Sequence, residues 1–202
     1  MSEWMKEIKI KPAYMSIVQQ PLCCGPAGFQ WVLLRRGLPI FTQEEIAKYC
    51  KLKILKKQQK YFLRKFPIVK RAKDTGTTVK DFAKCLQKFI KDKKLPLKIT
   101  YYLVSQVKDP VKLVVNNLKK GNDIIIHYHS KGLGQRKQVL GHVCVISAIK
   151  LGKKSILTLG DPYYFDPKFW DVELDKILKC MKPKWDGYER GFLIVNKMWL
   201  IW

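Results

Sequence analysis

The stretch from Val18 to Gly37 constrains the chain most, because it sets a cysteine at the expected start of a buried helix. Its sequence is VQQPLCCGPAGFQWVLLRRG. Gly25 and Pro26 follow Cys24, and proline favours the first turn of a helix, where its missing N–H is not needed. The apolar run after Pro26 predicts a buried helix that ends at Gly37. A thiol at such an N-terminus faces unpaired N–H groups and the positive end of the helix dipole, which favour the thiolate.

Two interpretations of this stretch are open from its own residues: a structural cysteine in a buried helix, or a nucleophile. Gln19 and Gln20 lie five and four residues before Cys24. A side-chain amide at either position is near enough in the chain to donate a hydrogen bond to an oxyanion that forms beside the sulfur. The choice therefore depends on what the rest of the chain supplies.

The charge is the unusual part of the composition, since 40 Lys and Arg residues stand against 16 Asp and Glu, a net charge of +24. Such a field attracts polyanions, acidic peptides or anionic membrane surfaces without selecting one of them. With 47% hydrophobic residues over 202 positions, the chain is expected to be globular and to bury its own core. No stretch reaches the roughly 20 apolar residues of a membrane span, and the N-terminus has no apolar signal core. We expect a soluble, cytoplasmic protein whose six scattered cysteines are mostly buried thiols.

The order of the expected elements favours an α+β fold, with residues 1–202 forming one domain. We expect a helical part to about residue 95 and a part rich in antiparallel strands from about 96 to 202. Capping boxes at Thr42 with Glu45 and at Thr78 with Asp81 predict two helix starts. The helix after Thr78 should bury one face, formed by Val79, Phe82, Ala83, Leu86, Phe89 and Ile90. Further helices are expected over 110–119 and 172–181, and strands over 98–104, 124–129, 141–149, 155–160 and 190–196.

A basic block interrupts the helical part, beginning at Lys48 and ending at Lys73. It holds eleven Lys or Arg residues and no acid, with apolar residues interleaved throughout. We expect the block to fold against the core with its charges outward, as the solvated face of an inserted helix. Contact with a polyanion or an acidic protein is the alternative use of this surface.

A histidine and an aspartate are predicted to face each other across a hairpin. If the hairpin turns at residues 151–152, positions whose numbers sum to about 303 lie opposite each other, as His142 and Asp161 do. The carboxylate would then orient the imidazole, which leaves its second nitrogen for a thiol. Taken singly, His142 suits a core histidine and Asp161 suits a turn. Together with Cys24 they predict a thiol, a base and a group that orients the base.

Four short motifs occur in order along the chain: Gln19, Cys24-Gly25-Pro26-Ala27, Gly141-His142-Val143 and Asp161-Pro162. They resemble the Gln, Cys, His and Asp motifs of the bacteriocin-leader-processing cysteine peptidases and their stand-alone relatives, a branch of the papain-like superfamily. The resemblance covers most of the chain, because Gly76-Thr77-Thr78 at a helix start and Trp170 after the Asp-Pro step also fit the stand-alone relatives. Three departures are a Gln-to-Cys interval of five instead of six, Cys23 directly before the nucleophile position, and the lack of a fused exporter domain. The basic block also has no counterpart. The family's transport-coupled role is not expected here, since no exporter domain is fused.

The resemblance implies a two-lobed papain-like fold with the active site between a helical lobe and a curved sheet. It implies Cys24 as nucleophile, His142 as general base, Asp161 as its orienting group and Gln19 as oxyanion donor, with Gln20 the other candidate. The implied activity is hydrolysis of a peptide or other amide bond, with a peptide or protein substrate and no cofactor. The same triad also suits acyl transfer to an amine, as in phytochelatin synthase-like relatives.

Metal binding and non-catalytic binding are the two alternative classes of function. Metal binding would use Cys23, Cys24, His142 and Cys144, with His127 or His129 nearby, but the cysteine spacing of a zinc site is missing, so no metal is expected. His127 and His129 are expected to be partly buried strand residues. A non-catalytic papain-like module would use its basic surface on nucleic acid or an acidic protein, and the retention of all four site residue types argues against it.

Overall fold

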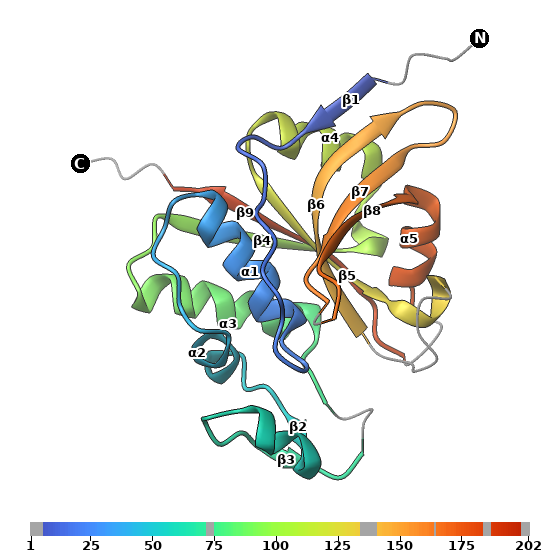
Figure 1. Cartoon of the computed structure of the whole chain (residues 1–202). Coiled ribbons are helices and arrows are strands. Elements are labelled where there is room, and N and C mark those ends of the chain that lie inside the picture. The colour runs from blue at the N-terminus through green and yellow to red at the C-terminus, as the bar shows by residue number, and fades with distance from the viewer. Residues whose placement is uncertain (1–5, 72–74, 134–140, 164, 184–186, 199–202) are drawn as a thin grey trace.

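A computed structural model of the chain describes residues 6–71, 75–133, 141–163, 165–183 and 187–198, and a large antiparallel sheet is its central feature (Figure 1). The strands are β1 (Lys6–Lys9), β2 (Ile54–Leu55), β3 (Ile68–Val69), β4 (Leu97–Leu103), β5 (Asp123–His129), β6 (Gly141–Leu151), β7 (Ile156–Asp161), β8 (Lys168–Glu173) and β9 (Gly191–Lys197). The large sheet has the order β4-β9-β5-β6-β7-β8, and β1 pairs with the end of β6 that β5 leaves uncovered.

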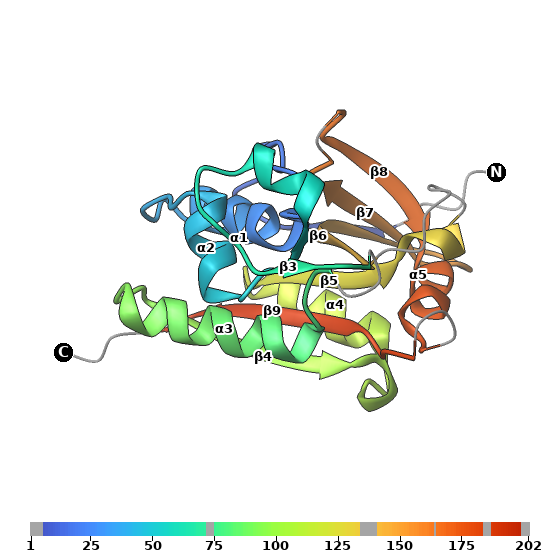
Figure 2. The same cartoon turned by 90° about the horizontal axis from the view of Figure 1, so that it is seen from below.

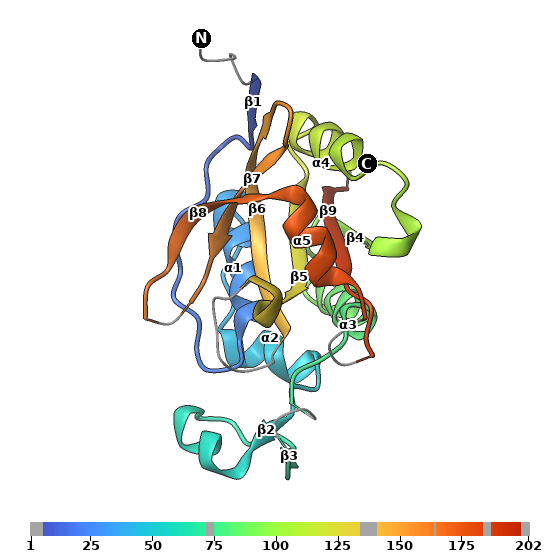
Figure 3. The same ribbon diagram turned by 90° about the vertical axis from the view of Figure 1, so that its right-hand side faces the viewer.

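Helices lie on both sides of this sheet. They are α1 (Cys24–Arg35), α2 (Gln43–Tyr49), α3 (Val79–Asp92), α4 (Pro110–Lys119) and α5 (Leu174–Met181), with short 3-10 segments η1 (Lys56–Tyr61), η3 (Val104–Gln106) and η4 (Ser130–Leu133). Figure 3 shows α5 in front of the strands and α1 behind them. Seen from below, α3 runs along β9 and β4 (Figure 2). The predicted α+β class is confirmed.

The helix starts follow the predicted capping chemistry. The Glu45 N–H donates to the Thr42 hydroxyl at 3.1 Å, and the Asp81 N–H donates to the Thr78 hydroxyl at 3.1 Å. All six residues of the predicted apolar face of α3 are buried. The helix that begins at Cys24 ends at Arg35, and Gly37 takes a left-handed φ of 62°, as expected of a residue just past a helix end.

A buried carboxylate ties the end of α1 to the sheet. Asp123, at the start of β5, accepts hydrogen bonds from Arg35 Nη2 at 2.8 Å and from the Tyr14 hydroxyl at 2.7 Å. Arg36 Nε donates to the same carboxylate. Because the charges are paired and hydrogen-bonded, the polar group is tolerated in the core and fixes the helix that carries Cys24.

The basic block departs from the prediction of a helix folded on the main core. Its described part, residues 48–71, forms β2, η1 and β3, and the two strands pair in parallel. It projects from the body (Figure 3) and has a small core of its own, which we call the lobe core: Cys23, Ala47, Leu52, Ile54, Phe62 and Phe66. The spacing of these apolar residues does not follow a helical period, so no helix face forms. The charges do point outward, whereas Leu63 is 99% exposed instead of buried, and Lys73 lies outside the described residues.

Two strands of the large sheet, β1 and β8, were not predicted. Both lie at sheet margins. Three of the four residues of β1 are polar, and two adjacent aromatic residues interrupt the alternation in β8, so neither strand has the regular apolar alternation by which a strand is recognised. The predicted helix over 172–181 begins two residues later, at Leu174, because β8 continues to Glu173. Among the described residues, no helix is both long enough and apolar enough to cross a bilayer.

Candidate active site

Cys24 is the first residue of α1, as the sequence predicts. Cys23 occupies the N-cap without a side-chain hydrogen bond, and Pro26 stands in the first turn. A Cβ added at Gly25 would lie 2.9 Å from the Phe82 ring, so the helix start approaches α3 as closely as only glycine allows. This close packing holds the start of α1 against α3.

The two adjacent cysteines have different surroundings. Cys23 is fully buried in the lobe core, and burial, followed by the neighbouring Cys24 and Glu44, raises the pKa of its thiol. Cys24 is only half-buried. Leu22, which precedes them, takes a left-handed φ of 63°, an unusual backbone for a bulky residue, and packs on the lobe core. Of the two thiols, Cys24 is therefore the one that a substrate can reach.

The two glutamines before the cysteines point to different partners. The Gln20 N–H donates to Gln43 Oε1 at 2.6 Å, and its side-chain amide donates to Glu44 at 3.3 Å. The Gln19 N–H donates to the Pro162 carbonyl at 2.8 Å, directly after Asp161. Gln19 is thus joined to the segment that carries the aspartate, whereas Gln20 is joined to α2.

His142 and Asp161 are in direct contact. The imidazole Nε2 lies 2.7 Å from Asp161 Oδ1, and both side chains are more than nine-tenths buried. Asp161 Oδ1 also accepts the Tyr163 N–H at 3.0 Å, which holds the carboxylate in place. With Nε2 occupied, Nδ1 is the nitrogen left for a thiol.

The strand register that brings this pair together differs from the prediction. Paired residue numbers sum to 305 at Val145 and Gly160 instead of 303, and an irregularity lies between Ile146 and Ala148. Continuing this register sets Asp161 opposite Cys144, so that His142 is its diagonal neighbour. The expected opposite pairing was wrong, but the contact forms because diagonal neighbours on one face are within reach of an imidazole and a carboxylate.

The surroundings of His142 favour its protonated form. Burial, the largest influence, lowers the pKa of the imidazole, but Cys144 and hydrogen bonds with Asp161, Cys144 and Cys24 raise it, and the resulting pKa lies well above the ordinary value. An imidazolium beside Cys24 would stabilise a thiolate. Thiolate and imidazolium together are the resting pair from which a cysteine nucleophile acts.

A second thiol, that of Cys144, lies near His142. Cys144 lies two residues along β6 on the same face as His142 and is fully buried, and the Tyr128 hydroxyl lies 3.5 Å from its sulfur. Burial is the main reason that the pKa of Cys144 is raised. The sequence placed Cys144 on the face of His142, but it did not indicate Tyr128, because nothing in the sequence marks a partner on a neighbouring strand.

The remaining histidines are more deeply buried than predicted. His127 is 7% exposed and packs on the Phe82 ring at 5.3 Å between ring centroids, and His129 is fully buried. His127 lies opposite Val143 and not opposite His142, so its side chain is on the α1 face of the sheet. His127 therefore lies on the face of the sheet opposite to that of His142.

The fold of this chain is similar to that of a solved peptidase domain. The peptidase domain of Streptococcus ComA, a bi-functional ABC transporter involved in a quorum sensing pathway, matches with a TM-score of 0.50 and 15% identity, over 93% of this chain and 99% of that domain. The chain has the fold of the ComA peptidase domain. A double glycine motif protease from an AMS/PCAT transporter, solved with its leader peptide, matches with a TM-score of 0.45 and 14% identity, over 96% of each chain. No protein-family model and no curated protein sequence matches.

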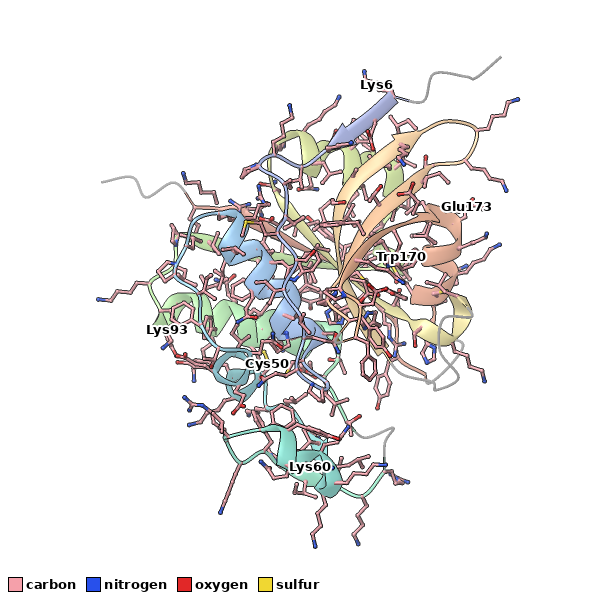
Figure 4. All side chains as sticks on the ribbon, viewed as in Figure 1. Lys6, Cys50, Lys60, Lys93, Trp170 and Glu173 are labelled. Atoms are coloured by element: carbon pink, nitrogen blue, oxygen red, sulfur yellow. The ribbon has the colours of Figure 1, made fainter. Side chains whose placement is uncertain are left out.

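The likeness to the ComA peptidase domain confirms the fold that the four motifs implied, a helical part set against an antiparallel sheet. A cavity of about 550 Å³ lies elsewhere on this fold, between β8 and α5, and none of the four candidate residues lines it. Figure 4 labels Trp170 and Glu173 of that region, which lie beside α5. The candidate site therefore lies where α1, β6 and β7 meet, away from this cavity.

Proposed function

We propose that the chain is a cysteine peptidase-like hydrolase that cleaves a peptide or other amide bond. Cys24 is the nucleophile, His142 the acid and base, Asp161 its orienting group and Gln19 an oxyanion donor. The observation that carries this proposal is the buried 2.7 Å contact between His142 and Asp161 next to a half-buried cysteine at a helix start.

The reaction follows from the charges of these groups. The Cys24 thiolate attacks the carbonyl carbon, and the oxyanion accepts hydrogen bonds from the Gln19 amide and the Cys24 N–H. His142, held protonated by Asp161, gives its proton to the leaving amine, and a thioester remains on Cys24. The neutral imidazole then takes a proton from water, whose oxygen attacks the thioester and releases the acid and the Cys24 thiolate, so that the thiolate–imidazolium pair is restored.

The hydrogen bonds of the two glutamines support Gln19 as the donor. The Gln20 amide is already directed to Glu44. The Gln19 backbone is tied to Pro162, beside the carboxylate that orients His142. One oxyanion donor is worth about a hundredfold to a thousandfold in turnover. Gln19→Ala should lose that much, and Gln20→Ala, the matched control, should change turnover far less.

The substrate class in this proposal is a peptide or protein, and the setting is the cytoplasm. The support is the shared fold with a peptidase domain. Transfer of the acyl group to an amine in place of water is the second outcome for the same thioester. Mass spectrometry of the products from one peptide, with and without an added amine, distinguishes a free acid from an amide.

Alkylation of the native protein with iodoacetamide across pH 5–8, followed by peptide mapping, tests the proposal. Cys85 is the other half-buried thiol, and a hydrogen bond from Cys50, chiefly, lowers its pKa to about 7, so the test uses Cys85→Ala as background. We expect Cys24 to react well below pH 7 and to slow at least tenfold in His142→Gln, with no such change in His127→Gln. Slow labelling shared among the cysteines, unaltered in His142→Gln, would refute the triad.

The basic lobe, residues 48–71, supports a second proposal: contact with a polyanion or an acidic protein. Its ten Lys and Arg residues are all exposed, and the lobe projects from the body on a core of its own (Figure 3). Binding of single-stranded RNA or poly-glutamate should then weaken steeply with salt. Changing Lys56, Lys57 and Lys60 to Gln should reduce the salt slope, whereas the same change at Lys80, Lys84 and Lys88 of α3 should not. A protein that binds in this way and has no reactive thiol would be a binding module and not a hydrolase.

A further inference from the structure

Three side chains that can bind a metal ion lie together near the candidate nucleophile Cys24. A nitrogen of His142, the sulfur of Cys144 and a carboxylate oxygen of Asp161 all lie within 4.8 Å of one another, and all three residues are buried. The hydrolysis proposed above uses His142 and Asp161 and has no role for Cys144. The proposed hydrolysis therefore does not explain why a buried thiol lies beside an imidazole and a carboxylate.

This donor set suits zinc. Zn²⁺ binds thiolate, imidazole and carboxylate at about 2.0–2.3 Å in a tetrahedron, which sets ligand atoms roughly 3.2–3.8 Å apart. The three side chains approach that spacing with small shifts, because 4.8 Å is the upper limit among them. Mg²⁺ and Ca²⁺ prefer sites made of oxygen ligands, so a cluster with one sulfur and one nitrogen selects against them.

The neighbours of the cluster are those that a metal site requires. The Tyr128 hydroxyl lies 3.5 Å from the Cys144 sulfur and can donate to a thiolate there. The Tyr163 N–H donates to Asp161 Oδ1 at 3.0 Å and orients the carboxylate. Such outer contacts commonly change metal affinity by about tenfold to a hundredfold. A metal ion can enter from the side of Cys24, which is half-buried and is one of the groups that raise the pKa of His142.

We propose that His142, Cys144 and Asp161 form a Zn²⁺ site whose occupation reversibly blocks the active site. Binding replaces the His142–Asp161 hydrogen bond by two metal–ligand bonds and adds a bond to the Cys144 thiolate. It releases two protons to solvent, one from the Cys144 thiol and one from Nε2 of the His142 imidazolium. One water fills the fourth position. The blocking role rests on the proposed function: with Zn²⁺ on Nε2, the His142 imidazole can no longer alternate between its protonated and neutral forms, as the proposed hydrolysis requires. The site itself does not depend on that function.

Cobalt(II) serves as the probe, because it takes zinc sites and a thiolate ligand gives it a charge-transfer band in the near ultraviolet. The full chain is titrated with Co²⁺ and then with Zn²⁺, which should remove the band. Cys144→Ser should lose the band and weaken Zn²⁺ binding at least about a hundredfold. Loss of an outer contact alone weakens binding by about a hundredfold at most, so a direct ligand should cost at least as much. Cys24→Ser should keep the band. Cys180 is a buried thiol on α5 whose pKa is raised by burial alone. Cys180→Ser is therefore the matched control and should also keep the band.

The outcomes separate the two proposals. A band that is absent from the native chain, that persists in a folded Cys144→Ser protein, or that disappears in Cys24→Ser overturns the zinc site. Circular dichroism establishes that each variant is folded. Zn²⁺ should also slow alkylation of Cys24 at least tenfold in the native chain and not in Cys144→Ser, with recovery on adding EDTA. Cobalt binding together with a Cys24 that hydrolyses no peptide would keep the site and refute the hydrolase.

Discussion

Replacing His127 by glutamine should remove a titration that destabilises the fold in acid. His127 is 7% exposed and packs on Phe82, and its pKa is lowered to about 3, first by burial and then by the charges of Arg190 and His142. In the unfolded chain a histidine titrates near 6.5. Between these two values the unfolded state binds a proton that the folded state excludes, so stability falls as the pH falls below about 6.5.

The size of this effect follows from the two pKa values. Each pH unit between them costs about 1.4 kcal/mol, so by pH 5 the native protein should have lost about 2 kcal/mol relative to pH 7 through this group. His142 acts in the opposite sense, because its pKa is raised and the stability that it contributes in acid is lost as the pH rises. A difference between two variants is therefore more informative than one curve.

Urea unfolding of the native chain and of His127→Gln at pH 7 and pH 5 measures the effect. The stability gap between the two proteins should shift by about 2 kcal/mol in favour of the variant at pH 5. Ile125→Val, on the same strand face, is the matched control, and its cost of roughly 0.5–1.5 kcal/mol should not depend on pH. If the native and His127→Gln values change in parallel within about 0.5 kcal/mol, burial does not exclude the proton.

Three further substitutions test other contacts. Asp161→Asn removes a charge-assisted bond worth about 1.5–3 kcal/mol, so kcat/KM on a cleaved peptide should fall roughly tenfold to a hundredfold, and an unchanged value would contradict its orienting role. Asp123→Asn leaves the guanidinium groups of Arg35 and Arg36 without a counter-charge and should cost about 3–5 kcal/mol in urea unfolding; a loss under 1 kcal/mol would argue against a buried ion pair there. Gly160→Ala drives a methyl group into the Trp31 ring and should cost about 1–3 kcal/mol, seen as a lower Tm, whereas an unchanged Tm would mean that the ring moves aside freely.

Local chemistry predicted much of the fold. The capping residue Thr78 and the apolar period after it located α3 and its buried face, since both signals act within a few residues. The position of Cys24 at the start of a helix was predicted for the same reason, because its signals, Gly25 and Pro26, follow it directly. The strands β1 and β8 were missed because short strands at a sheet margin are held by pairing with a neighbouring strand, and their own residues do not indicate that pairing.

The predicted contact between His142 and Asp161 forms, but the strand register behind it was not predicted. A turn that is longer than expected and an irregularity beside Ser147 shift the register of β6 and β7, and neither follows from residue types. As a result, Cys144 faces Asp161, and His142 contacts it diagonally. The choice between Gln19 and Gln20 likewise depends on Glu44 of α2, a partner more than twenty residues away that the sequence does not indicate.

The lobe core reaches the backbone of the candidate nucleophile. It includes Cys23, and it supports the left-handed Leu22, so the turn before Cys24 is held partly by Phe62 and Phe66 of the basic lobe. Glu44 adds to this link, because it accepts the N–H groups of Leu63 and Arg64. The lobe and the turn should therefore open as one cooperative unit, with amide hydrogen exchange at Cys23 rising together with exchange at Phe62. A protein shortened through this lobe would lose the shape of the nucleophile turn along with its positive charge.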